Sequence, residues 1–242
     1  MISKSIFWIC GSMFVTDYLS QLLYKILCYP SPFDLFPTTN IPHNARWFFV
    51  HAATNLGICL LGYEDLRYCL TNPSDCAMST WTRSSRLTFQ LAVISHLYHI
   101  LMFFSSLKKD EWIHHIVMLF GAGPITVMRP SRVTTVGLFF MTGLPGFFDY
   151  VLLWLVKLNK LNPMTEKKLY IWISTWLRSP GCALACFLSV PALLVAPRDE
   201  KILLLAQALL TIWNGQYYMM KTCVDYGRKL EQPSRTKKSA ET

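Results

Sequence analysis

Long apolar stretches recur along almost the whole of this chain, and they most strongly constrain its fold. In a lipid bilayer every backbone N–H and C=O group needs an internal partner, so a single apolar stretch crosses as an α-helix. About 20 residues suffice, because a helix rises about 1.5 Å per residue. The sequence predicts seven such helices, near 5–28, 46–66, 86–107, 111–128, 133–156, 168–195 and 201–221.

The composition agrees with a membrane environment. Of 242 residues, 52% are apolar and 15% are charged. Soluble domains typically carry about 25% charged residues. We therefore predict an all-α, polytopic membrane protein, with a first helix and connecting loop at 1–41, a six-helix domain at 42–228 and a disordered basic tail at 229–242. Because Asp17 interrupts the first apolar stretch, we interpret it as a retained helix rather than a signal peptide.

Lysine and arginine are distributed unequally between the two predicted sides of the membrane. With a cytosolic C-terminus, the inner side carries 14 of them and the outer side 8. This asymmetry predicts a cytosolic C-terminus, and we expect the endoplasmic reticulum as the location. The net charge of +9 suits a surface that meets anionic lipid. No basic stripe lies on a soluble element, so we predict no nucleic-acid partner.

Four of the six histidines fall between residues 96 and 115, and all four lie in or beside predicted membrane helices. They are His96, His99, His114 and His115, and His51 is a further candidate in the second helix. Ionisable groups at such depth usually serve a function, although each ring could instead bond across a helix interface as a core residue. The candidates cluster in the predicted cytosolic half of the bilayer, which favours one polar site.

Helical periodicity predicts which of these side chains share a face. His96 and His99 lie on one face, and His51 shares a face with Asn55. His114 and His115 diverge by about 100°, so we expect at most one of them to point directly into a common cavity. The short linker at 108–110 makes the third and fourth helices antiparallel neighbours, which brings His99 near His114 or His115.

Asp149 lies in an otherwise apolar stretch, where a carboxylate needs a histidine, Arg178 or water as a partner. A membrane di-iron centre is an alternative interpretation of the histidines, but such centres use more histidines than this chain has, and we predict no metal site. Cys69 and Cys76 lie in a predicted lumenal loop and are candidates for a disulfide. Prolines at 180 and 191 are expected to kink the sixth helix.

Three further segments are NARWFFVHAATN at 44–55, DEWIHHIVMLFGA at 110–122 and LTIWNGQYYMMKTC at 210–223. They resemble, in this order, the opening, the His-His segment and the closing segment of the TLC domain, a family that includes the ceramide synthases, the TRAM proteins and several lipid-homeostasis proteins. The resemblance covers about 180 residues. It implies a seven-helix bundle with a polar cavity and a role in lipid metabolism.

The resemblance to the ceramide synthases also implies catalytic roles for His114, His115 and Asp149. The chain departs from their signature at Gly146, which stands in place of the first of two aspartates. Two hypotheses follow. The chain binds or senses lipid and affects membrane composition, or it is a lipid N- or O-acyltransferase with acyl-CoA as co-substrate and no other cofactor.

The two hypotheses share one set of site residues and partners. Besides the three catalytic candidates, residues expected to bind the ligand are His51, Asn55, His96, His99, Arg178 and Asn214. The partners are membrane lipids, with acyl-CoA in the enzyme hypothesis. The sequence leaves open whether the chain forms a homo-oligomer.

Overall fold

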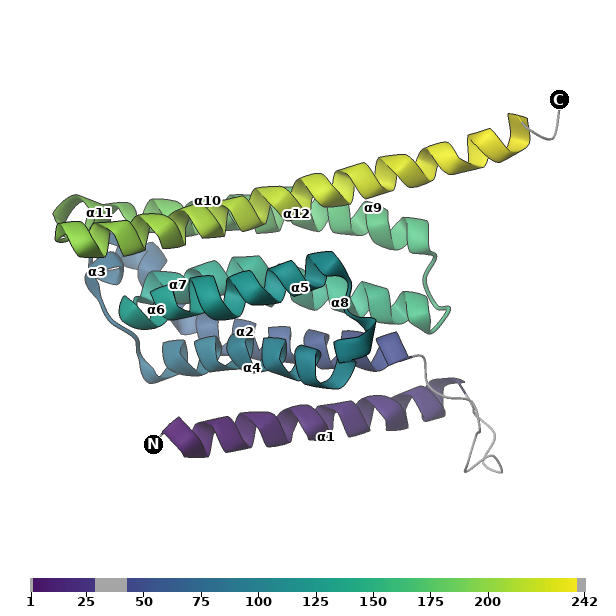
Figure 1. The fold of residues 1–242 in the computed structure, drawn as a ribbon, viewed down its shortest axis with the longest axis horizontal. Helices are drawn as coiled ribbons and strands as arrows, with labels where there is room; N and C mark the ends of the chain where they lie inside the picture. Colours follow the sequence, from purple (N-terminus) through teal and green to yellow (C-terminus); the bar gives the residue numbers. More distant parts are fainter. Residues whose placement is uncertain (1, 29–42, 239–242) are drawn as a thin grey trace.

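The computed structural model describes residues 2–28 and 43–238, and the side chains of 5–23 and 45–231. Every regular element in this part of the chain is helical, which confirms the predicted all-α class. The helices run side by side along the long axis of the molecule (Figure 1). The purple helix α1 and the yellow helix α12 lie at opposite edges of this bundle.

The long helices alternate with short turns and with changes of helix type. The α-helices are α1 (Ile2–Cys28), α2 (His43–Thr71), α3 (Pro73–Met78), α4 (Arg83–Phe103), α5 (Lys109–Ile116), α6 (Gly123–Met128), α7 (Arg132–Leu138), α8 (Leu144–Lys157), α9 (Pro163–Ile173), α10 (Ser179–Leu188), α11 (Val190–Val195) and α12 (Arg198–Lys238). The 3₁₀ turn η1 spans Phe104–Ser106, and the π-helical turns are η2 (Val117–Ala122), η3 (Phe139–Gly143) and η4 (Ser174–Arg178).

Four helical segments among the described residues are long and apolar enough to cross a membrane. They span Ser5–Leu23, Arg83–Ser106, Arg132–Lys157 and Pro163–Val195. These segments coincide with the first, third, fifth and sixth predicted helices. The other three predictions fall on α2, on α5 to α6 and on α12, which are helical but are not among these four segments. The arrangement of seven spans stays a prediction.

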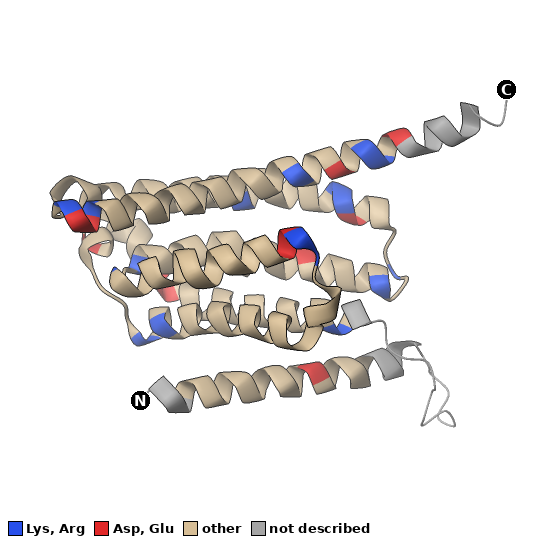
Figure 2. Cartoon of the chain, viewed as in Figure 1, with Lys and Arg blue, Asp and Glu red and all other residues tan. Residues whose placement is uncertain are grey.

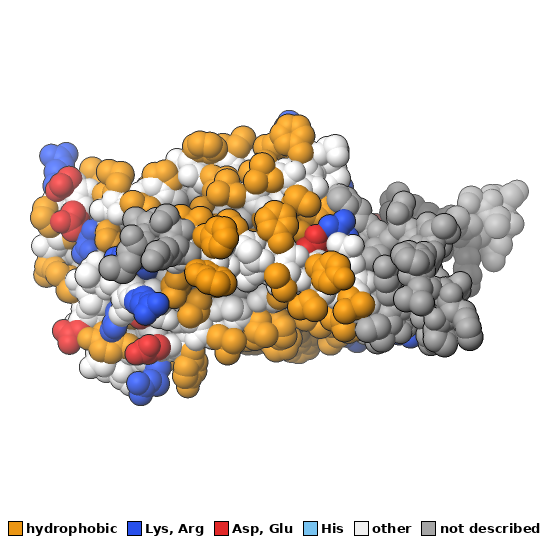
Figure 3. All heavy atoms as spheres, turned by 90° about the horizontal axis from the view of Figure 1, so that it is seen from below, with side chains coloured by type: hydrophobic (Ala, Val, Ile, Leu, Met, Phe, Trp, Pro, Cys, Tyr) orange, Lys and Arg blue, Asp and Glu red, His pale blue; other side chains and the backbone are white. Residues whose placement is uncertain are grey.

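The surface of the bundle is apolar along its length and charged at its ends. Lys, Arg, Asp and Glu gather toward the two ends of the helices (Figure 2). On the face seen in Figure 3, apolar side chains cover the middle of the molecule. Leu101, Phe120 and Leu194 are each more than 70% exposed. Such continuous apolar exposure is typical of a protein whose sides contact lipid rather than water.

Proline explains where the long helices change type. Pro124, Pro145 and Pro180 are each the second residue of the α-helix that follows a π-helical turn. Proline has no N–H to donate to the carbonyl four residues earlier, and its ring crowds that carbonyl, so the preceding turn widens. At Pro180, where the sequence predicts a kink, the structure shows this change of helix type. Pro191 likewise stands at the start of α11, after the break that ends α10.

The helix at each edge of the bundle is held differently. α1 packs against α2 and α4, and its Asp17 forms an ion pair with Arg46 on α2. α12 packs along α10 and α9. It continues to Lys238, so the described part of the predicted tail at 229–242 is helical. The predicted connecting loop, 29–41, lies outside the described residues.

A disulfide and two polar contacts connect the helices at the end of the bundle that contains α3 and α11. Cys69 and Cys76 form a disulfide, which confirms the pairing expected from the sequence. The buried carboxylate of Asp65 accepts a hydrogen bond from Ser85 and pairs with Arg132. These contacts join α2 to α3, α4 and α7, so the helices keep one relative position at this end.

Candidate functional site

A cavity of about 690 Å³ opens inside the other half of the bundle, where α5 and α9 begin. Side chains from α2, α4, α5, α8, α9 and α12 line it. Eight of the nine site residues expected from the sequence are among them: His51, His96, His99, His114, His115, Asp149, Arg178 and Asn214. The structure therefore brings together residues that lie up to 163 positions apart in the sequence.

Two histidine pairs connect α4 to α5 across this cavity. His96 Nε2 lies 3.1 Å from His114 Nε2, and His99 Nδ1 lies 2.9 Å from His115 Nε2. The predicted meeting of the third and fourth helices is confirmed. The expectation that at most one of His114 and His115 faces a common cavity is wrong. Because the cavity extends around α5 from α4 to α12, two diverging side chains both reach it.

Neighbouring hydrogen bonds determine which of the two rings donates the proton in the His96–His114 pair. The Ala92 carbonyl oxygen can only accept, so His96 Nδ1, 2.6 Å away, is the donor. In a neutral His96 the Nε2 atom is then an acceptor, and His114 donates its Nε2–H. His114 Nδ1 in turn accepts from the Tyr218 hydroxyl at 3.1 Å. The result is an ordered chain from Tyr218 through His114 and His96 to Ala92.

Trp47 lies between His51 and the other histidines of the cavity. Its ring packs between His51 and His99, with the Trp47 and His51 centroids 3.6 Å apart. His51 Nδ1 is 2.9 Å from the Trp47 carbonyl oxygen, so it is the donor of that pair. His51 thus forms part of the cavity wall, and its Nε2 is the acceptor of the neutral ring.

Arg178 is anchored on the opposite wall. It donates to the Tyr170 hydroxyl at 2.8 Å and to the Asn214 side-chain oxygen at 3.1 Å. Its guanidinium also lies 4.5 Å from the centroid of the Tyr218 ring. These contacts place a fixed positive charge beside the ring that bonds His114.

Asp149 lines the same cavity without a fixed partner. Among the described residues it makes no hydrogen bond or ion pair, neither with a histidine nor with Arg178, the side-chain partners expected from the sequence. Its charged neighbours are Glu166, Arg178 and Lys167. An unpaired carboxylate in such surroundings is costly, and it is available to a ligand that offers a donor or a positive charge.

Asn55 is the one expected site residue that does not line the cavity. It lies one helical turn behind His51, and its side-chain oxygen accepts a hydrogen bond from Thr142 at 2.9 Å. A Cβ atom at Gly146 would come within 2.5 Å of the Asn55 amide nitrogen. Asn55 therefore joins α2 to η3, and an aspartate at position 146 would require the Asn55 side chain to move.

The site includes residues that the sequence analysis missed. On α12, Tyr218, Lys221, Asp225 and Arg228 line the cavity together with Asn214. These positions recur every three or four residues, which is the spacing of one helical face. This spacing is visible in the sequence, but the residues that lie between the polar positions make it hard to recognise.

Charged pairs surround the end of the cavity nearest the C-terminus. Lys167 on α9 donates to Asp225 on α12, and Lys221 on α12 donates to Asp110 on α5 at 3.0 Å. The hydrogen bond from Lys167 holds the pKa of Asp225 below its usual value, although partial burial opposes this shift. Cations and carboxylates thus alternate at this end, so it carries no strong excess of either sign.

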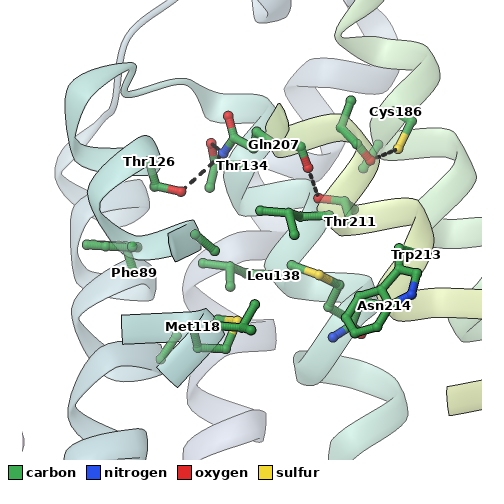
Figure 4. Close-up of a pocket in the computed structure, with 18 of the residues that line it drawn as sticks. Phe89, Met118, Thr126, Thr134, Leu138, Cys186, Gln207, Thr211, Trp213 and Asn214 are labelled. Atoms are coloured by element: carbon green, nitrogen blue, oxygen red, sulfur yellow. Dashed lines mark hydrogen bonds between the residues drawn. The ribbon is translucent and has the colours of Figure 1, made fainter. Parts of the chain in front are cut away.

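An apolar chamber of about 190 Å³, shown in Figure 4, adjoins the polar cavity. His96, His114, Asn214 and Tyr218 line both spaces. Phe89, Met118 and Leu138 lie on the walls of the chamber in Figure 4. Gln207, near its far end, donates to Thr134 at 2.6 Å and to Thr126 at 3.2 Å. The polar site therefore adjoins a space suited to hydrocarbon.

Comparison with known proteins gives no match, whether to a protein-family model, a curated protein or a solved structure. The resemblance to the TLC domain stays a prediction. Function is therefore inferred from the geometry of the cavity and from the sequence motifs.

Proposed function

We propose that this protein is a membrane lipid-handling protein that binds a lipid inside its helix bundle and thereby affects membrane lipid composition. The polar head of the lipid occupies the histidine cavity, and its hydrocarbon chain occupies the apolar chamber. The observation that carries this proposal is that the two spaces adjoin, because His96, His114 and Tyr218 line both of them.

The volume and lining of the polar cavity support this proposal. Small-molecule sites commonly measure about 300–1,000 Å³ and place a few polar groups among apolar walls. The cavity of about 690 Å³ falls within this range. Asp149 offers a carboxylate, and the fixed guanidinium of Arg178 lies on the other wall. These groups suit a lipid head that carries amine or hydroxyl groups.

The TLC resemblance supports the proposal from the sequence side. It implies a polar lipid site within a seven-helix bundle, and we propose the endoplasmic reticulum membrane as its location, with the cytosolic C-terminus that the charge asymmetry predicts. The cavity lies at the end of the bundle nearest the C-terminus (Figure 1). A lipid head at this depth is within reach of the membrane surface.

Blocking the apolar chamber tests the proposal. Ala208 lines the chamber, whereas its neighbour Leu209 is 57% exposed on the outside of the bundle. We expect Ala208→Trp to fill the chamber and to reduce a specifically bound lipid by about tenfold or more, since tenfold corresponds to about 1.4 kcal/mol. Leu209→Trp is the matched control. The measurement is mass spectrometry of lipids that co-purify with the full chain in mild detergent.

The expected result is one lipid class enriched over the bulk membrane in the wild type and in Leu209→Trp. A wild-type sample that contains only the bulk lipid mixture would contradict the proposal. So would an enriched lipid that Ala208→Trp retains in full, with the folded state of each variant checked by size-exclusion chromatography.

The ordered hydrogen bonds favour a second function, acyl transfer from acyl-CoA to a lipid amine or hydroxyl. In this reaction a histidine of the cavity takes the acceptor proton as the new acyl bond forms and the CoA thiolate leaves. Histidine suits this role because its usual pKa lies near neutrality. The hydrogen bonds from Tyr218 through His114 to His96 would hold the rings, and the nearby carboxylate of Asp149 would stabilise the charged ring electrostatically.

This second function predicts large losses for single substitutions. We expect His114→Ala, His115→Ala and Asp149→Asn to lower product formation by about 100-fold or more. Glu64→Gln, which changes an exposed carboxylate on α2, is the matched control. The assay supplies labelled acyl-CoA and a panel of sphingoid bases and lyso-lipids to microsomes at equal expression. Equal product formation in all variants would exclude these residues from the chemistry.

A further inference from the structure

We infer that His96, His114 and His115 form a binding site for one transition-metal ion, with Zn²⁺ as the best fit. One ring nitrogen from each residue lies within 4.8 Å of the others. The inference is independent of the proposed lipid, because all three ligands belong to the chain.

The spacing of the first two histidines already approaches that of metal ligands. Zinc binds histidine nitrogen at about 2.0–2.1 Å in a tetrahedral arrangement, which sets neighbouring nitrogens about 3.4 Å apart. The Nε2 atoms of His96 and His114 are 3.1 Å apart. A small movement apart of the two rings therefore admits the ion.

In each of the three rings one nitrogen bonds a residue outside the group, which leaves the other nitrogen available to the ion. His96 Nδ1 bonds the Ala92 carbonyl, and His114 Nδ1 bonds the Tyr218 hydroxyl. His115 Nε2 bonds His99. Metal-binding histidines almost always have such a partner for their second nitrogen, because it fixes the tautomer and the direction of the ring.

The free nitrogen of His115 is a second, independent observation. His115 is only 3% exposed, and its Nδ1 has no hydrogen-bond partner among the described residues. A buried polar atom without a partner costs free energy. The His96–His114 contact could be an ordinary hydrogen bond, but such a bond leaves His115 Nδ1 unpaired, whereas a bound ion would satisfy it.

Ligand chemistry favours zinc over magnesium or calcium. Imidazole suits Zn²⁺, Cu²⁺, Fe²⁺ and Ni²⁺, whereas Mg²⁺ and Ca²⁺ prefer oxygen ligands. Three histidines leave a fourth tetrahedral position open toward the cavity. Asp149, which lines that cavity without an ion pair, can offset part of the positive charge. The histidine count argues against a dinuclear centre, but one ion needs only three.

When the ion binds, His114 must give up the Nε2 proton that it donates to His96. The proton can occupy His114 Nδ1 instead, where the Tyr218 hydroxyl oxygen accepts it. Tyr218 is thus a positioning residue for the metal site. Loss of such an outer contact typically weakens metal binding by about 10- to 100-fold.

The test uses the full chain in mild detergent, purified with an affinity tag that contains no histidine. The protein is dialysed against a chelator and titrated with Zn²⁺, and bound metal is measured by mass spectrometry. We expect one Zn²⁺ per chain. We expect His96→Ala, His114→Ala and His115→Ala each to weaken binding by about 100-fold or more, and Tyr218→Phe to weaken it by about 10- to 100-fold.

His51→Ala is the matched control, because His51 lines the same cavity but lies outside the three-histidine group. Replacing Zn²⁺ with Co²⁺ adds a spectroscopic signature, since a tetrahedral site gives an intense visible absorption that a merely structural histidine does not. The variants His96→Gln and His114→Gln repeat the test with smaller changes in volume, and size-exclusion chromatography confirms that each is folded.

A wild-type chain that binds no Zn²⁺ would overturn the inference, as would ligand variants that bind as tightly as His51→Ala. The outcome is distinct from that of the lipid proposal. Ala208→Trp is expected to lose the lipid and to keep the metal, because it fills the apolar chamber and leaves the three histidines unchanged.

Discussion

At the scale of single residues, the aspartates of this protein differ in what their carboxylates contact. Asp17 and Asp65 each pair with an arginine, and Asp225 pairs with Lys167. Asp149 has no such partner among the described residues, although it lines a cavity. Paired carboxylates hold helices together. An unpaired one adds nothing comparable to the fold, so its place is better explained by a ligand.

Asp225 provides a test of one such pair. The hydrogen bond from Lys167 lowers the native pKa of Asp225 below its unfolded value of about 3.9. A lowered pKa stabilises the native state above the unfolded pKa, and this stabilisation is lost as the pH falls through the native pKa. We expect acidification from about pH 5 to about pH 3 to lower the thermal unfolding midpoint more in the wild type than in Asp225→Asn.

The measurement is thermal unfolding in detergent at low ionic strength. Asp199→Asn, which changes an exposed aspartate at the start of α12, is the control and should follow the wild type. If Asp225→Asn loses as much stability on acidification as the wild type does, the ion pair is not formed in solution.

At the scale of helices, prolines and polar contacts between helices determine how the side chains of the cavity are positioned. The π-helical turns before Pro124, Pro145 and Pro180 widen the helices and change the direction of the side chains that follow. Tyr170 and Arg178 show the effect. In a regular α-helix, two residues eight positions apart point about 80° away from each other. The π-helical turn η4 changes this angle, and the Arg178 guanidinium reaches the Tyr170 hydroxyl at 2.8 Å.

The ion pair between Asp17 and Arg46 predicts how α1 is held. The Asp17 side chain is 7% exposed, so removing Arg46 leaves a buried charge, which typically costs about 3–5 kcal/mol. We expect Arg46→Ala to lower the thermal unfolding midpoint strongly. The double variant Asp17→Asn with Arg46→Gln should recover most of the loss, because neither side chain is then charged.

The pair between Lys221 and Asp110 is the control for this experiment. Its side chains are 47% and 64% exposed, and an exposed pair contributes about 0–1 kcal/mol. Lys221→Ala should therefore change the midpoint little. A loss in Arg46→Ala no larger than that in Lys221→Ala would show that α1 is held by apolar packing alone.

At the scale of the whole molecule, polarity is reversed relative to a water-soluble helical protein. Apolar side chains cover the middle of the face seen in Figure 3. Histidines, Asp149 and Arg178, by contrast, line an interior cavity. The charged side chains gather at the ends (Figure 2). This distribution fits a bundle that crosses a membrane and shields a polar site from lipid.

The two ends of the bundle predict its orientation. The disulfide between Cys69 and Cys76 requires an oxidising compartment, and it lies at the end opposite the C-terminus (Figure 1). Together with the charge asymmetry, this predicts a lumenal 67–85 loop and a cytosolic C-terminus. Protease treatment of sealed microsomes should remove a C-terminal tag and spare a tag inserted in 67–85. Protection of the C-terminal tag would reverse the orientation.

Much of this arrangement follows from local sequence patterns. The apolar stretches predicted the helices, and the predicted clustering of the histidines with Asp149 agrees with the single cavity that they line. The pairing of α4 with α5 followed from the short linker at 108–110. These features depend on residues close together in the chain, which is why hydropathy, periodicity and loop length suffice to predict them.

Only the tertiary structure decided which polar atoms meet. It pairs His96 with His114 and supplies Tyr218 from more than 100 residues away, while Asn55 bonds Thr142 of η3 instead of lining the cavity. The π-helical turns shift side-chain directions away from a regular 3.6-residue period. A hydrogen bond forms only when donor and acceptor are at the right distance to within tenths of an ångström. Local sequence patterns predict which helices are neighbours but not their exact positions, so the contacts across the cavity are determined by the packing of the whole bundle.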